Sequence, residues 1–176
     1  RLITSPASPK EYMYNCYTGG YLDFVNNAYK SALGLKKLWE YLGCIIDFTD
    51  EELAFSIIHS NLGVLGDKEH GEYYITNDND WMIKNRGEVY KVNPELQHML
   101  VSDRSLYILQ SYNIPMTQKE YLSIRLSSGM YAEGNKTYLM GFNKDTDLKT
   151  NLPFIVHQAS VLGYKIGSDK QKQENS

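Results

Sequence analysis

The chain has 176 residues, of which 42% are hydrophobic and 22% are charged, and its net charge is −3. This length is sufficient for one domain with a sizeable core, and the weak negative charge argues against a protein that binds nucleic-acid polymers by electrostatic attraction. No apolar run approaches the about 20 residues that span a bilayer. The two cysteines, Cys16 and Cys44, lack metal-type spacing and favour a reducing compartment, so we expect a cytoplasmic protein without a membrane partner.

The first third of the chain is predicted to form an arm and two helices. Residues 1–10 contain two prolines and several small polar residues, which is typical of an arm. Apolar residues recur at helical spacing over residues 21–42. Thr49 and Glu52 have the spacing of a capping box, in which each side chain accepts a hydrogen bond from the other residue's backbone N–H, so a second helix is expected at residues 51–60.

The middle and the C-terminal half show other local signals. At residues 72–91, β-favouring residues flank polar turn residues, which predicts a small hairpin or flap. Asn93 followed by Pro94 indicates a short helix with asparagine as its cap. A loop is expected at residues 127–138. Longer helices are predicted at residues 102–112, after the capping box of Thr117 and Glu120, and from Pro153 onward.

The polar residues 168–176 are low in hydrophobicity and are expected to form a disordered tail. The remaining elements lie in one continuous pattern without a linker, so we expect a single domain over residues 11–167. The predicted fold is mainly α, a helical bundle of six or seven helices with the small β-hairpin or flap around residues 72–91.

Five stretches of the sequence are individually of moderate specificity, and they are informative through their common order and spacing. They are CYTGGYLDF (16–24), EELAFSIIHSNLGVLGD (51–67), NRGEVYKVNPELQHMLVSDRSLYILQ (85–110), YLSIRLSSGMYAEGNKTYL (121–139) and NLPFIVHQAS (151–160). In this order they resemble the HD-domain metal-dependent phosphohydrolases, in particular the small versions found in bacteriophages. The resemblance implies an all-helical fold that holds divalent cations through His…His-Asp…Asp and cleaves phosphate esters, commonly of nucleotides.

The same resemblance indicates that the metal ligands have been replaced. The family's His, His-Asp, His-Asp and Asp align in turn with Phe24, Ser60-Asn61, Ser127-Ser128 and Ser160. Imidazole and carboxylate groups would be needed to hold the cation, so neither a metal nor a cofactor is expected. Neutral residues avoid the repulsion between carboxylates that lack a cation, and we expect them to line a widened neutral cavity. His59 lies one residue too early, and a shift of one helical residue turns a side chain by about 100°.

Cationic and aromatic residues in or near the matching stretches remain as binding candidates. Arg125 is the strongest, because it lies in the IRLSSG stretch, and Arg104 follows; a buried ion pair is the alternative for both. The fifteen tyrosines predict either aromatic core edges or a pocket or interface with aromatic walls. The predicted ligand-binding set is Arg125, Arg104, Ser60, Asn61, Ser127, Ser128, Ser160, Phe24, Lys84, Arg86, Tyr131, Lys136 and His157.

Three functions follow from this interpretation. The first is a non-catalytic protein that binds and sequesters a nucleotide or nucleotide-derived signalling molecule, in the setting of a phage protein that counters host defence signalling. The second is a protein-binding module or inhibitor on the same scaffold, and self-association into a homo-oligomer stays open. The third is a metal-dependent nucleotide phosphohydrolase with unorthodox ligands drawn from His59, His70, His157 or Asp67.

Overall fold

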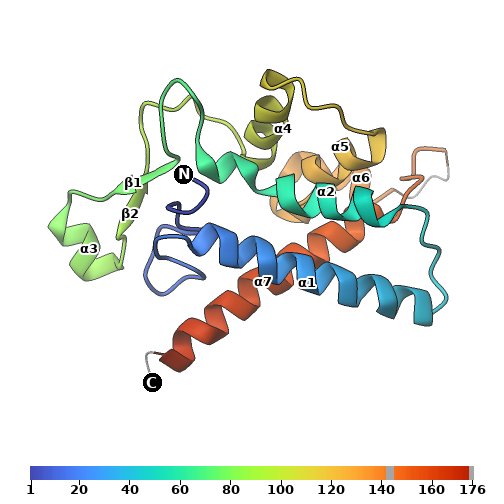
Figure 1. The fold of residues 1–176 in the computed structure, drawn as a ribbon, viewed down its shortest axis with the longest axis horizontal. Helices are drawn as coiled ribbons and strands as arrows, with labels where there is room; N and C mark the ends of the chain where they lie inside the picture. Colours follow the sequence, from blue (N-terminus) through green and yellow to red (C-terminus); the bar gives the residue numbers. More distant parts are fainter. Residues whose placement is uncertain (142–144, 175–176) are drawn as a thin grey trace.

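The computed structural model describes residues 1–141 and 145–174 of the chain, and over these residues the fold is mainly helical (Figure 1). A two-stranded antiparallel sheet lies between the helices in sequence. The mainly α class with a small β element, predicted from the sequence, is therefore confirmed. The elements are α1 (Gly20–Tyr41), α2 (Asp50–Ser60), β1 (Tyr74–Thr76), α3 (Asp80–Arg86), β2 (Tyr90–Val92), α4 (Val101–Ser111), α5 (Gln118–Arg125), α6 (Lys136–Leu139) and α7 (Leu152–Glu174).

Two capping boxes fix the starts of α2 and α5. The Thr49 hydroxyl accepts from the Glu52 backbone N–H at 3.1 Å, while the Glu52 carboxylate accepts from the Thr49 N–H at 3.0 Å. Thr117 and Glu120 repeat both bonds at the start of α5. Both boxes were predicted from the sequence and both are confirmed, because the signal is contained within four residues.

The core lies where α1 crosses α7, with α2 packed beside them (Figure 1). Small residues permit this close crossing. A Cβ atom added to Gly163 of α7 would lie 3.1 Å from the Cβ atom of Ala28 in α1 and 3.1 Å from the Phe24 ring. The other buried apolar side chains of this core include Ala32, Leu53, Ile57, Leu152, Ile155, Val156 and Ala159. Among the described residues, no helix is long and apolar enough to cross a membrane.

The predicted hairpin at residues 72–91 is more elaborate in the structure. Strands β1 and β2 pair in antiparallel register, with Ile75 opposite Lys91, but helix α3 connects them instead of a turn. The reason is Asn79, whose side-chain oxygen accepts from the backbone N–H groups of Trp81 and Met82 at 3.1 and 3.2 Å and so caps a helix. Asparagine favours turns and helix caps alike, so the local sequence did not separate the two.

Two further predictions are corrected by the structure. The helix expected after Asn93 is absent from the described structure there; Asn93 instead donates to the carbonyl groups of His70 and Glu72 at 2.9 and 3.0 Å. The predicted disordered tail is helical as far as Glu174, because α7 continues beyond the core. Residues 175–176 of that predicted tail lie outside the described residues.

Candidate functional site

Phe24, at the first aligned metal-ligand position, is part of an aromatic cluster. Its ring stacks on Tyr164 of α7, with centroids 4.9 Å apart and planes 12° apart, and Tyr14 contacts both rings. Phe24 is 3% exposed. Burial raises the pKa of the Tyr164 hydroxyl, and a hydrogen bond with the Asn61 side chain opposes this rise. Two of the aligned positions, Phe24 and Asn61, thus meet around one tyrosine.

Ser60 and Ser160, at two of the other aligned positions, are buried, and each donates to a backbone carbonyl group in the preceding turn of its own helix. Ser60 Oγ donates to the Ile57 carbonyl at 3.0 Å, and Ser160 Oγ donates to the Val156 carbonyl at 2.9 Å. The two cavities described below are lined by neither Ser60 nor Ser160, so neither of them corresponds to the widened neutral cavity expected at these positions. The Phe24 ring contributes apolar contacts to the fold and has no group that could bind a metal ion. Its partners Tyr14 and Tyr164 come from two other parts of the chain.

Arg125 makes structural contacts. Its guanidinium donates to Asn135 Oδ1 at 2.8 Å and forms an ion pair with Asp103 of α4 at 3.2 Å. Asn135 is fully buried and in turn donates to Ser128 Oγ at 3.3 Å. Arg125 therefore ties the segment after α5 to α4 through an ion pair, but this pair is partly exposed, whereas the alternative expected a buried one.

The three histidines named as unorthodox metal ligands each contact a different partner. His59 Nδ1 donates to the Phe55 carbonyl at 2.8 Å, and His157 Nδ1 donates to the Ser127 carbonyl at 2.9 Å. His70 lies elsewhere, beside Asp67, with Nδ1 3.2 Å from the carboxylate. Within residues 1–141 and 145–174, no group of three or more His, Cys, Asp or Glu side chains is arranged to hold a metal ion.

A cavity of about 740 Å³ is lined by the chain segment that follows α2 and by residues of α4. One wall is the turn that begins with the short 3-10 helix Leu62–Leu65 and continues to His70. The opposite wall is α4, with the segment before it. Arg104 is the member of the predicted ligand-binding set that lines this cavity.

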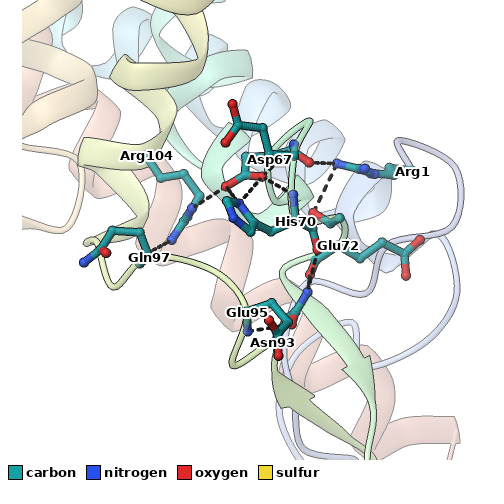
Figure 2. A network of polar contacts seen from close by, with 10 residues as sticks. Arg1, Asp67, His70, Glu72, Asn93, Glu95, Gln97 and Arg104 are labelled. Carbon is teal, nitrogen blue, oxygen red and sulfur yellow. Dashed lines mark hydrogen bonds and ion pairs between the residues drawn. The ribbon is translucent and has the colours of Figure 1, made fainter.

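Arg104 reaches the cavity from the inside of the fold. Its side chain is 2% exposed. One terminal nitrogen lies 3.4 Å from Asp67 Oδ2, the other donates to the Gln97 carbonyl, and the guanidinium carbon is 5.8 Å from the centre of the Tyr73 ring (Figure 2). Arg104 Nε is buried and has no hydrogen-bond partner among the described residues. A guanidinium has five N–H donors, so Arg104 retains capacity to bind an acceptor in the cavity.

The carboxylate beside Arg104 is held by its own loop. Asp67 Oδ1 accepts from the backbone N–H groups of Glu69 and His70 at 3.0 and 2.7 Å. Figure 2 shows Arg104 and Arg1 on opposite sides of this loop, where Arg1 donates to the carbonyl groups of Asp67 and Gly71. Burial alone would raise the pKa of Asp67, but the hydrogen bonds and charge of His70 with the Glu69 N–H outweigh it, and the pKa lies below its usual range.

The cavity also has apolar and aromatic lining residues. Tyr107 and Tyr112 of the α4 wall are 48% and 60% exposed, so their rings are available to a ligand. Sequence reasoning did not identify them. A usable signal existed, because Arg104, Tyr107, Ile108 and Ser111 have the spacing of one helix face, and all four line the cavity. The other apolar lining residues are Leu62, Leu65 and Met99.

The remaining predicted residues lie away from this cavity. Lys84 and Arg86 border a second, shallower hollow of about 440 Å³, and Arg86 lies 5.7 Å from the centre of the Trp81 ring. Lys136 pairs with Glu133 at 3.7 Å, and Tyr131 is 92% exposed. Neither hollow is lined by Phe24, Ser60, Asn61, Ser127, Ser128, Ser160, Arg125 or His157.

Comparison of the chain with protein-family models, with curated proteins and with solved structures found no match.

Proposed function

We propose that the protein binds a nucleotide or nucleotide-derived small molecule in the cavity beside Arg104 and releases it chemically unchanged. The observation that carries this proposal is a buried guanidinium with an unpaired Nε on the wall of a cavity of about 740 Å³. Ligand pockets for small molecules commonly measure about 300–1,000 Å³, so a mononucleotide is within the size range.

The lining of the cavity offers partners for both parts of a nucleotide. Arg104 has planar N–H donors that match phosphate oxygens, and Lys68 also lines the cavity. Tyr107 and Tyr112 offer exposed rings on which a base can stack. The buried position of Arg104 lowers the entropy cost of binding, because the guanidinium is already held in place.

The residues around the aligned metal-ligand positions support binding without turnover. Phe24, Ser60, Asn61 and Ser160 supply neither imidazole nor carboxylate groups, and they are packed against Tyr164 or bonded to the backbone. The ligand would therefore bind next to the corner that follows α2 instead of within it. In an infected bacterial cell, retention of a signalling nucleotide would lower its free concentration, which is the anti-defence role we propose.

The test is isothermal titration of the purified protein with a panel of cyclic and linear nucleotides, followed by denaturation and mass spectrometry of the recovered ligand. Recovery of an intact nucleotide supports sequestration. A hydrolysed product would overturn it in favour of the phosphohydrolase alternative. Absence of binding across the panel would overturn the proposal altogether.

Variants locate the site. Arg104→Lys keeps the charge but loses the planar fork, and we expect at least about tenfold weaker binding. Tyr107→Ala, at an exposed ring, should weaken binding several-fold without affecting folding. Lys37→Met removes a cation from the exposed surface of α1 and is the matched control, with unchanged affinity expected. Unchanged affinity in both cavity variants would refute this location.

A second candidate function rests on exposed apolar side chains at the end of α1. Tyr41, Leu42 and Ile45 are 87%, 65% and 74% exposed and lie close together in the sequence. Large exposed apolar groups of this kind mark protein-binding surfaces, and a second copy of the chain is one such partner. Light scattering of the purified protein, with Leu42→Ser as the comparison, tests self-association. A monomer unaffected by this substitution would remove the homo-oligomer from consideration.

A further inference from the structure

We propose that Asp67 is a specificity-determining residue that limits the ligand of this cavity to a single negative charge, as in a phosphodiester. The inference rests on the proposed function, since it concerns the same cavity. It starts from the buried pair that Asp67 forms with Arg104, whose facing atoms are 3.4 Å apart.

The buried pair is electrically neutral. The Arg104 side chain is 2% exposed and the Asp67 side chain is 14% exposed, so both charges are poorly screened by solvent. An anion that contacts Arg104 therefore also lies close to the Asp67 carboxylate. Among the described residues Arg104 Nε has no hydrogen-bond partner, so the guanidinium has an unused donor, but the pair adds no net positive charge to attract a polyanion.

Asp67 is also fixed in position. Its Oδ1 atom accepts from two backbone N–H groups, those of Glu69 and His70, at 3.0 and 2.7 Å. A ligand phosphate that displaced the carboxylate would break both of these hydrogen bonds. They are shorter than the 3.4 Å contact between Asp67 and Arg104, so the loop, more than Arg104, holds the carboxylate in place. The ligand must consequently share Arg104 with Asp67 and tolerate the carboxylate as a neighbour.

The other charged side chains that line the cavity add one positive charge to the net charge of its wall. Apart from His70, the lining residues outside the pair carry one net positive charge, because Arg1 and Lys68 are cations and Glu69 is an anion. One negative charge on a ligand is offset by this wall. A second negative charge on the ligand has no matching cation and is repelled by the carboxylates of Asp67 and Glu69. At a separation of a few Å and an effective dielectric constant of about 20, this repulsion weakens binding at least about tenfold.

The experiment compares nucleotides that carry the same base and differ in the charge of their phosphate groups. The probes are the 3′,5′-cyclic monophosphate, which carries one negative charge, the 5′-monophosphate, which carries about two, and the 5′-triphosphate, for each of the four common bases. Titrations are done without divalent cations, which would neutralise the extra charge. For the base that binds best, we expect the cyclic form to bind at least about tenfold more tightly than the 5′-monophosphate, and the triphosphate to bind more weakly again.

Substitutions of the acidic residues that line the cavity test whether their charge causes the selectivity. Asp67→Asn keeps the oxygen that accepts from the loop N–H groups but removes the charge, and should narrow the ratio between the cyclic and 5′-monophosphates by at least about threefold. Glu69→Gln, at an exposed position, should act in the same direction with less risk to folding. Asp78→Asn is the control, because Asp78 pairs with Lys91 outside the cavity and the ratio should not change.

The outcomes separate this inference from the proposed function. If 5′-mono- or triphosphates bind as tightly as the cyclic form, or if both wall substitutions leave the ratio unchanged, charge selection by Asp67 is refuted while nucleotide binding stands. If no nucleotide of the series binds, the proposed function fails, and the selectivity inference fails with it.

Discussion

Replacement of Phe24 by alanine tests whether the aromatic cluster that it forms with Tyr14 and Tyr164 stabilises the fold. Phe24 is 3% exposed and has two aromatic neighbours, Tyr164 at 4.9 Å and Tyr14 at 5.7 Å between ring centroids. Truncation of a buried phenylalanine to alanine costs about 3–5 kcal/mol, and the loss of two ring pairs places this variant in the upper part of that range. For a chain of this length the melting temperature should fall by roughly 10 °C.

The assay is urea denaturation followed by far-UV circular dichroism, in which the slope with denaturant should stay unchanged while the midpoint falls. Tyr131→Ala is the control, since this ring is 92% exposed and its loss should change the free energy of unfolding by less than about 0.5 kcal/mol. A loss below about 1 kcal/mol for Phe24→Ala would refute the structural role of the cluster. Under conditions where the variant remains folded, nucleotide affinity should persist, because the proposed cavity does not include Phe24.

Three other outcomes are expected. Arg125→Ala should lower the free energy of unfolding by about 2 kcal/mol, because it removes the Arg125 donor from Oδ1 of the buried Asn135, yet nucleotide titration should give an unchanged affinity; loss of binding in a folded variant would instead make Arg125 a ligand residue. Gly129→Ala should lower the melting temperature markedly, because φ is +57° and the new Cβ would lie 2.3 Å from the His157 ring; an unchanged melting curve would contradict this packing. The pKa of Asp67 is lowered in the folded state, so its ionised carboxylate stabilises the fold at pH values above the ordinary aspartate pKa of about 4. This contribution is lost as the pH falls through the folded-state pKa. The difference in free energy of unfolding between the unsubstituted protein and Asp67→Asn should therefore shrink in acid and stay unchanged in base.

The fold was largely predictable because its main signals are local. The apolar periodicity predicted α1 to within one residue at each end, and the capping boxes located α2 and α5. The errors also have local causes. Asn79 caps a helix where a turn was expected, and residues of the predicted tail continue α7, since a polar composition does not itself end a helix that is anchored in the core.

The candidate site was predictable only in part. Arg104 was named from the sequence, but its neighbours Tyr107 and Tyr112 were not, although the spacing on α4 was available. The strongest sequence candidate, Arg125, is engaged by Asn135 and Asp103 instead. An arginine in a motif looks the same whether its partner is a ligand or another side chain, because the partner is set by residues distant in the sequence.

The sequence by itself determined where α1, α2 and α5 begin, and the mainly α class. Only the tertiary structure decided that Phe24 meets Tyr164, a residue at the other end of the chain, and that Arg104 shares a cavity wall with Asp67. The physical reason is range. Caps and helical periods act over a few residues, whereas a ring cluster, a buried ion pair and an empty volume exist only after distant segments have packed together.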